Sequence, residues 1–398
     1  MKKYFLAVAS FFIYSHISLG QVYPGQMDST FVPVRSHHYD PELTFDFCVN
    51  EPAWNNQAGI HSAFGSTDRL YFRKEVPVNH NNDLSSSYST TVWRGERANA
   101  QILVWSSEAL EQVRVSTQDL RSAEGNIIPK DRITFELVRY VLSNYPYAEK
   151  KAICGESPYK SGFLMPDRFE TLDRFDLPSQ TTRPVWMMVD VPRGTVPGTY
   201  KGQVEVRAKG KAPQLLNLEI VVQNQLLPYP KDWKYRLDLW QNPWAVAWYN
   251  HVEPWSPEHK MLLKQHLKHY ADAGGTYITT YGVHSPWSDN SYMIEGGMIE
   301  WIKKADGTWA FDYKIFDEYV ELAMECGIDE AITLYTPIPW GFRHRYKDEA
   351  TGDYSYINWA PSSEEFKKMW NIFLTDFKFH LEAKSWLDIT YIGINENP

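Results

Sequence analysis

Cysteine is scarce in this sequence, which has three among 398 residues: Cys48, Cys154 and Cys326. An odd count at such wide spacing excludes a disulfide framework and matches no zinc-binding pattern. A single Cys48–Cys154 disulfide stays open as an alternative, although no feature of the sequence requires it. Cys326 closes a helix predicted over residues 313–326, where we expect a buried thiol.

Runs of basic residues and recognisable cofactor motifs are also missing. The chain carries 40 Lys and Arg against 49 Asp and Glu, a net charge of −9. This balance argues against nucleic acid or an anionic membrane surface as the main partner. The sequence contains no HExxH, no GxSxG and no glycine-rich phosphate loop, so it indicates neither a metal nor a cofactor.

Only the N-terminus holds a sustained apolar stretch. Met1-Lys2-Lys3 is followed by a mostly apolar segment, 4–17, and then by Ser18-Leu19-Gly20. This order predicts a secretory signal peptide over residues 1–20, too short to span a bilayer, and we expect a secreted or periplasmic protein. Gln21 stands where a lipoprotein would need cysteine. No later stretch is apolar enough for a membrane span.

Aromatic residues are abundant at 15%, including 16 Trp, and 43% of the chain is hydrophobic. This composition is that of a globular protein, and the length predicts two domains at roughly 100–200 residues per domain. Most of the aromatic side chains must serve core packing. Flat amphipathic rings also suit sites that stack on sugars.

The first domain, 21–226, is predicted as an antiparallel β-sandwich. Short alternating segments separated by Gly and Pro are typical of this fold. We expect strands at 100–105, 113–115, 184–189, 203–206 and 216–222.

A stiff linker, 227–233, then leads to a second domain, 234–398, in which strands and helices alternate. We expect strands at 235–239, 276–281, 331–335 and 389–394, and a hairpin around Asp306-Gly307. Three helices are expected: one capped by Ser256 with Pro257 at its first position, one capped by Asp312, and one opened by a Ser362/Glu365 capping box. This pattern predicts the first half of a (β/α)8 TIM-type barrel, whose full form needs about 250 residues. We therefore expect either a fragment of a longer protein or a truncated gene product.

The loops that follow barrel strands hold active sites, because they open onto one face. Eleven of the 16 Trp lie in 234–398, several of them at these strand ends. The predicted substrate-binding residues are Trp240, Trp244, Tyr281, His284, Trp287, Tyr335 and Trp340. For each of them, packing or strand termination is the alternative.

Glu396 is the strongest candidate for catalysis. A Glu at the end of the fourth strand, in an aromatic pocket, would have a raised pKa and could protonate a leaving glycosidic oxygen. Its neighbour Asn395 can orient a substrate group. His259, His266 and His269 are interpreted as the solvated face of a helix, and Arg343 and His344 as solvated loop charges.

Several motifs together resemble glycoside hydrolase family 123, the secreted β-N-acetylgalactosaminidases and their relatives. In the first domain they are 93–101 (WRGERANAQ), 183–186 (RPVW) and 197–202 (PGTYKG). At the junction they are Leu227-Pro228 ahead of Trp233, and in the second domain 391–396 (YIGINE).

The resemblance implies retaining hydrolysis of a terminal β-linked N-acetylhexosamine, in which the sugar's own acetamido oxygen attacks and forms an oxazoline. An Asp-Glu pair performs this chemistry in the family, which places the general acid/base at Glu396 and the acetamido-orienting group at Asn395. Asn395 departs from the family's Asp, and a neutral amide should slow the step. Two alternatives stay open: a two-carboxylate retaining glycosidase with its nucleophile beyond residue 398, and a non-catalytic sugar-binding relative.

Overall fold

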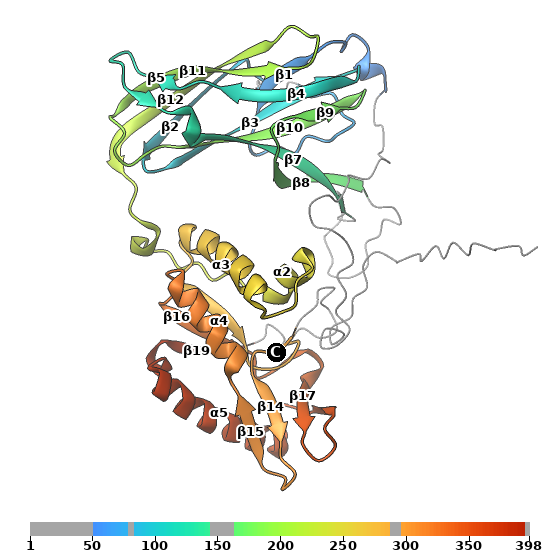
Figure 1. The fold of residues 1–398 in the computed structure, drawn as a ribbon, viewed down its shortest axis with the longest axis vertical. Coiled ribbons are helices and arrows are strands. Elements are labelled where there is room, and N and C mark those ends of the chain that lie inside the picture. Colours follow the sequence, from blue (N-terminus) through green and yellow to red (C-terminus); the bar gives the residue numbers. More distant parts are fainter. Residues whose placement is uncertain (1–50, 79–82, 144–162, 287–295, 395–398) are drawn as a thin grey trace, which may run out of the picture. The chain divides into compact units, whose positions relative to one another are not determined.

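The computed structural model describes residues 51–78, 83–143, 163–286 and 296–394, which fall into two compact units, Pro41–Pro228 and Tyr229–Pro398. Each unit has its own hydrophobic core. Figure 1 labels the helices and strands of both units. None of the helices in the described part of the chain has the length and apolar character needed to cross a lipid bilayer.

In the first unit the described residues form two β-sheets. The five-stranded sheet has the order β1-β3-β10-β7-β8, with all neighbours antiparallel. The larger sheet has the order β2-β12-β11-β4-β9, with β5 paired to β11 and β6 paired to β5. The strands are β1 (His61–Gly65), β2 (Ser87–Arg94), β3 (Arg97–Ser106), β4 (Leu110–Thr117), β5 (Leu120–Arg121), β6 (Ile127–Ile128), β7 (Ile133–Ser143), β8 (Phe163–Thr171), β9 (Phe175–Leu177), β10 (Thr181–Asp190), β11 (Gly198–Arg207) and β12 (Gln214–Leu226). Short 3-10 helices lie at Glu51–Trp54 and Lys130–Arg132.

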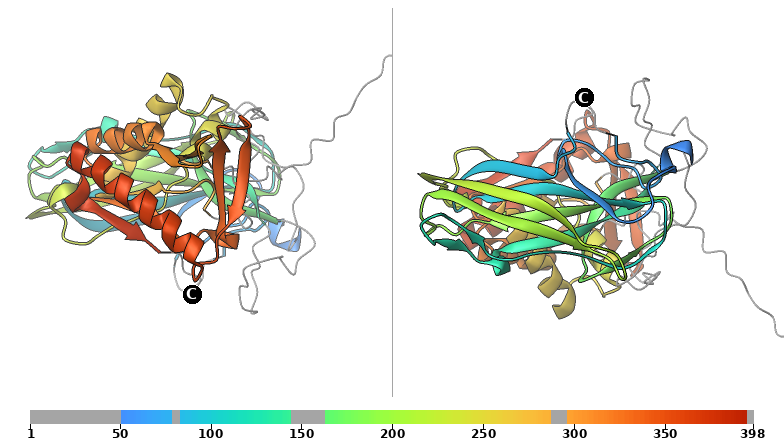
Figure 2. Two further views of the ribbon diagram at one scale, coloured as in Figure 1. Left: turned by 90° about the horizontal axis from the view of Figure 1, so that it is seen from below. Right: turned by 90° about the horizontal axis from the view of Figure 1, so that it is seen from above.

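Alternation of side chains along each strand builds the core between these sheets. On β12, Leu216, Leu218, Ile220 and Val222 are all at most 2% exposed, because successive side chains of a strand point to opposite faces. They share one cluster with Ile102 and Val104 of β3 and other residues of the opposite sheet. Seen from above, the strands form two overlying layers (Figure 2, right).

The strands predicted for this unit are confirmed at β3, β4, β10, β11 and β12. The expectation of a wholly antiparallel arrangement is wrong at one place, because β2 pairs with β12 in parallel. That pairing joins segments some 130 positions apart, as Asn217 lies opposite Ser87. No local turn signal encodes such a pairing.

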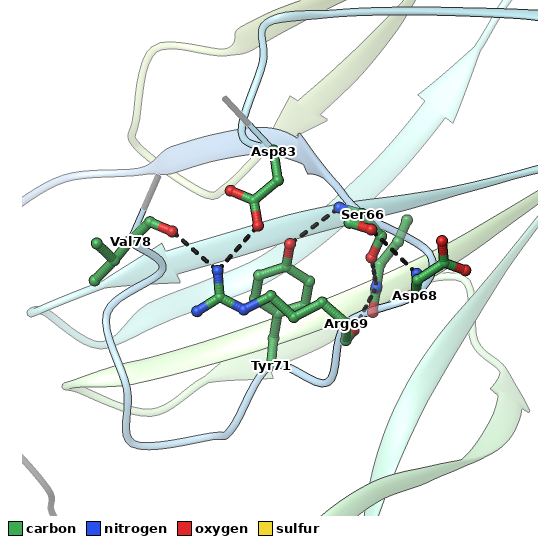
Figure 3. A network of polar contacts seen from close by, with 7 residues as sticks. Ser66, Asp68, Arg69, Tyr71, Val78 and Asp83 are labelled. Atoms are coloured by element: carbon green, nitrogen blue, oxygen red, sulfur yellow. Dashed lines mark hydrogen bonds and ion pairs between the residues drawn. The ribbon is translucent and has the colours of Figure 1, made fainter. Parts of the chain in front are cut away.

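The loop after β1 is fixed by a polar network (Figure 3). Arg69 donates to the carbonyl oxygen of Val78 (3.2 Å) and to the carboxylate of Asp83 (3.0 Å), and the Tyr71 hydroxyl accepts from the backbone N–H of Ser66 (3.0 Å). Tyr71 lies so near the strand end that a β-carbon on Gly65 would approach its hydroxyl oxygen to 2.7 Å. Glycine at position 65 therefore permits the close approach.

The second unit is built on a three-stranded parallel sheet, in the order β13-β16-β19 within the described ranges. A second sheet of four short strands, in the order β15-β14-β17-β18, accompanies it and is called the small sheet. The strands are β13 (Tyr277–Tyr281), β14 (Glu300–Lys303), β15 (Trp309–Asp312), β16 (Ala331–Tyr335), β17 (Arg343–Asp348), β18 (Tyr354–Asn358) and β19 (Thr390–Gly393). The helices are α2 (Pro243–Asn250), α3 (Pro257–Asp272), α4 (Lys314–Glu325) and α5 (Glu364–Lys384), with 3-10 helices at Pro230–Asp232, Trp340–Phe342 and Leu387–Ile389.

Trp301 of β14 anchors the small sheet. Its ring stacks on Phe373 of α5 at 4.8 Å, and its indole N–H donates to the carbonyl oxygen of Gly282 (2.9 Å), just beyond β13. On the same side, Trp370 of α5 donates its indole N–H to His344 of β17 (3.2 Å). The long helix α5 accordingly lies along the small sheet (Figure 2, left).

Several predictions for this unit are confirmed and others are wrong. Ser256 caps α3 with Pro257 in the first turn, the hairpin turns at 304–308, and Cys326 carries a buried free thiol. The predicted strand 235–239 is absent apart from a single bridge, Leu237 to Gly275. The cap of α5 is Ser363 instead of Ser362. The N-cap position of α4 is Tyr313, and the predicted Asp312 lies one residue earlier, where its carboxylate accepts the backbone N–H of Lys314 in the first turn (2.8 Å).

Candidate active site

The carboxyl ends of the three parallel strands lie at one edge of the sheet. Tyr281 of β13 pairs with Tyr335 of β16, which in turn pairs with Gly393 of β19. The backbone N–H of Gly282 donates to the carbonyl oxygen of Tyr335 (2.7 Å), which continues the alignment one residue past β13. The loops that follow these strands therefore start side by side, as they do at the active-site face of parallel α/β folds.

Four of the predicted aromatic residues gather at this edge. The rings of Trp240 and Tyr335 are 5.0 Å apart, and those of Trp244 and Tyr281 stack at 5.3 Å. Tyr281 also donates its hydroxyl to the carbonyl oxygen of Gln241 (2.8 Å), which ties the loop before α2 to β13. The structure thus brings together residues that are almost a hundred positions apart.

The exposed fractions of these four residues differ sharply, which distinguishes residues that pack in the core from a residue that a ligand can contact. Trp244, Tyr281 and Tyr335 are 4%, 1% and 1% exposed, whereas Trp240 is 50% exposed. A β-carbon on Gly296 would lie only 2.4 Å from the Trp244 ring, so the backbone there covers that ring. Of these four residues, Trp240 offers the open aromatic surface.

The loops after β13 and β16 contact each other through Trp340. Its backbone N–H donates to the carbonyl oxygen of Pro286 (2.9 Å), and its side chain is partly buried. Trp287, Asn395 and Glu396 lie outside the described residues.

His284 follows β13 and lines a cavity of about 530 Å³. Burial lowers the pKa of its imidazole well below the ordinary value, and the nearby positive charges of Arg345 and Arg343 lower it further. The ring is therefore neutral at pH 7, so it can donate one hydrogen bond and accept another.

The same cavity is lined by residues that the sequence analysis did not single out, among them Glu300 and Arg345. Burial raises the pKa of the Glu300 carboxyl, and its Oε2 atom accepts from the Tyr354 hydroxyl (3.0 Å). The alternation of basic residues over 343–347 could have indicated Arg345 from the sequence, because this pattern is typical of a strand with one polar face.

Two histidines that were interpreted as solvated are buried. His259 is fully buried, and its Nδ1 accepts from the backbone N–H of Trp255 (2.8 Å) while its Nε2 donates to the carbonyl oxygen of Pro243 (2.9 Å). His344 is 2% exposed within the aromatic core. Within the described ranges, no group of three or more His, Cys, Asp or Glu side chains is arranged to hold a metal ion.

Two protein-family models match this chain. The model of the glycoside hydrolase 123 catalytic domain matches residues 240–398, and the model of the glycoside hydrolase 123 N-terminal domain matches residues 64–208. The N-terminal model lies within the β-rich first unit, and the catalytic model lies within the second unit, which carries the parallel sheet. The chain belongs to glycoside hydrolase family 123.

A solved structure supports this membership. The family 123 glycoside hydrolase from Clostridium perfringens, described for glycolipid glycan hydrolysis, matches with a TM-score of 0.74 and 27% sequence identity. The match covers 84% of this chain, and the chain spans 58% of that structure.

Other solved structures match only weakly. The PapD-like domain 7 of human CEP192 has 12% identity and a TM-score of 0.22, covering 46% of this chain and 99% of its own. The Salmonella SafD adhesin has 13% identity and a TM-score of 0.20, covering 34% and 93% respectively. Scores this low do not establish a shared fold. No curated protein matches the sequence.

Proposed function

We propose that this protein is an exported glycosidase that removes terminal β-linked N-acetylgalactosamine, or a related N-acetylhexosamine, from glycans. The observation that carries the proposal is the match of the family's catalytic-domain model over residues 240–398, which include Asn395 and Glu396. The likeness to an enzyme described for glycolipid glycan hydrolysis supports a glycan substrate. The signal peptide expected over residues 1–20 supports export. We further propose that the parallel strands β13, β16 and β19 form part of a (β/α)8 barrel.

The proposed mechanism retains the anomeric configuration and uses the substrate's own acetamido group. The acetamido oxygen attacks the anomeric carbon while the Glu396 carboxylic acid protonates the departing glycosidic oxygen, which yields an oxazolinium ion that keeps its N–H. The Glu396 carboxylate then takes a proton from water while this water attacks the anomeric carbon, which opens the oxazolinium ring and restores the acetamido group. Asn395 accepts a hydrogen bond from the acetamido N–H. The half-exposed ring of Trp240 supports stacking on a sugar near this edge.

The substrate's acetamido group provides the first test. The full chain should hydrolyse a phenyl N-acetyl-β-galactosaminide at least about 100-fold faster than the phenyl β-galactoside, which lacks the internal nucleophile. Because phenol is a poor leaving group, Glu396→Gln should lower kcat by about 10²–10⁴-fold with an unchanged circular dichroism spectrum. Equal rates for the two glycosides would contradict the mechanism. Labelling of a carboxylate by a fluorosugar would favour the two-carboxylate alternative.

Asn395 provides the second test, because a carboxylate there would stabilise the positive charge that develops on the acetamido nitrogen. Asn395→Asp should therefore raise kcat by about tenfold or more. Asn397→Asp adds the same charge two residues away and is the matched control, with no rise expected. A rise in both variants, or in neither, would show that Asn395 does not occupy the acetamido-orienting position.

The Asn at this position also favours one competing function, a sugar-binding relative without turnover. That function predicts measurable binding of N-acetylgalactosamine together with no hydrolysis of any glycoside. Product release by the unmodified chain would exclude it.

A further inference from the structure

One face of the small sheet forms part of the wall of the cavity beside His284. Glu300 and Ile302 of β14 and Arg345 and Lys347 of β17 line one side, and Lys260 of α3 lines another. All of these residues belong to the unit that carries the parallel strands. The volume of about 530 Å³ falls within the range of small-molecule sites.

Strand β17 places its basic residues on this face by alternation. Arg343, Arg345 and Lys347 share one side of the strand, and the opposite side carries His344, which is buried against Trp370. The result is a row of three cations, of which Arg345 and Lys347 line the cavity. A strand with this pattern presents positive charge to the cavity and apolar surface to the core.

Two tyrosines of β18 hold the guanidinium groups in place. Arg343 lies over the ring of Tyr356 at 3.7 Å, and Arg345 lies over the ring of Tyr354 at 4.2 Å. In each pair, the arginine and the tyrosine are diagonal neighbours in the antiparallel β17–β18 register. Stacking of this kind restricts the arginine side chains before any ligand arrives, which lowers the entropic cost of binding.

The acidic residues around the cavity already have partners. Glu318 pairs with Lys260 (3.2 Å), and Asp312 accepts from the backbone N–H of Lys314 (2.8 Å). Glu300 accepts the Tyr354 hydroxyl (3.0 Å), and its carboxylate also interacts electrostatically with Arg345 and Lys347. Among the residues that the structure describes, the ammonium groups of Lys314 and Lys347 form no ion pair.

The lining therefore combines surplus positive charge with apolar surface from residues such as Trp255 and Ile315. Burial is the main cause of the depressed pKa of His284, and the positive charges of Arg345 and Arg343 lower that pKa further. A neutral imidazole supplies one donor and one acceptor, the complement that a sugar hydroxyl needs.

We propose that this cavity is a subsite for an acidic sugar, one bearing a carboxylate or a sulfate, with Arg345 and Lys347 binding the anion. The planar guanidinium can donate two parallel hydrogen bonds to either anion, and the Lys347 ammonium adds a point charge. The inference deepens the proposed function, because it makes glycans that carry an acidic sugar beside the terminal N-acetylhexosamine the preferred substrates. It rests on that function only for the identity of the ligand as a sugar.

The test measures binding of three monosaccharides to the full chain by calorimetry or saturation-transfer NMR. The probes are N-acetylneuraminic acid for the carboxylate, N-acetylgalactosamine 6-sulfate for the sulfate, and neutral N-acetylgalactosamine. At least one acidic sugar should bind about tenfold tighter than the neutral sugar, and this advantage should shrink as salt is added. Equal binding of all three probes would overturn the proposal.

Substitutions locate the binding site. Lys347→Gln changes an exposed side chain and should fold normally, and Arg345→Lys keeps the charge but removes the planar fork. Each should weaken binding of the acidic sugar by about tenfold. Arg207→Gln removes an exposed arginine on β11 and is the matched control. Unchanged affinity in both cavity variants would place the acidic sugar elsewhere and refute the assignment.

Hydrolysis assays keep this inference separate from the proposed function. Turnover of the neutral phenyl N-acetyl-β-galactosaminide without preferential binding of either acidic probe would contradict the proposed subsite and leave the proposed activity standing. Binding of an acidic probe that depends on Lys347 and Arg345, without turnover of any glycoside, would support the subsite and contradict the proposed activity.

Discussion

His344 shows how a single buried side chain acquires a fixed protonation state. The Trp370 indole N–H donates to Nε2 (3.2 Å), so Nδ1 carries the proton and donates it to the carbonyl oxygen of Phe342 (3.1 Å). Both nitrogens are thus satisfied in the neutral form. Burial lowers the pKa of the imidazole to about 4.

This depressed pKa predicts a loss of stability in acid. Between the unfolded pKa of 6.5 and the folded value of about 4, the unfolded chain binds a proton that the folded chain does not, so stability falls as the pH is lowered. The contribution is about 2–3 kcal/mol between pH 7 and 4.5. His344→Gln, whose amide oxygen can accept from Trp370, should flatten the pH dependence of the free energy of unfolding in urea. His269→Gln, on the exposed face of α3, should leave that dependence intact, and an equal slope in all three proteins would contradict the prediction.

Single residues also mark the limit of what the sequence could predict about the site. Tyr281 and Tyr335 were expected at strand ends, and the structure places them there, but their rings pack against Trp244 and Trp240, which come from another segment. His259 shares a helix with two exposed histidines, and only its packing beneath Trp255 removes it from solvent. Exposure is decided by these tertiary contacts, which periodicity within one segment does not contain.

At the scale of elements, the predictions succeeded where the signal is local. Helix α3 begins at Ser256-Pro257 and ends before Gly274 because capping and chain reversal are encoded within a few residues. The cap of α5 was misassigned by one position because Ser362 and Ser363 are adjacent and both precede acidic residues.

Elements that depend on distant partners were missed. The segment 235–239 has the composition of a strand, yet it forms a single bridge, to Gly275. Strands β17 and β18, which form the positive face of the cavity, pair across a turn at 348–353 that the sequence analysis did not identify. The pairing of β14 with β17 in parallel joins the loop after β13 to the loop after β16. These loop insertions, more than the parallel sheet itself, shape the proposed sugar subsite.

At the scale of the whole molecule, the chain consists of two units with separate cores, as the catalytic and N-terminal family models also divide it. In the first unit, two β-sheets enclose one apolar cluster that draws on nearly every strand. Every described residue of that cluster belongs to the unit 41–228, so the apolar contacts described for it lie within that unit.

We therefore predict that residues 41–228 fold cooperatively on their own, and that mutations of their core cost the same in the fragment as in the full chain. Leu216 and Leu215 are adjacent on β12, and the residues are 2% and 52% exposed. Leu216→Ala should lower the free energy of unfolding by about 2–5 kcal/mol, since it removes buried methyl groups and leaves a cavity. Leu215→Ala should change it by no more than about 0.5 kcal/mol. Urea unfolding of both variants, in the fragment and in the full chain, checks the prediction. A fragment without a cooperative transition, or a Leu216→Ala cost that appears only in the full chain, would mean that the first unit depends on the second for its stability.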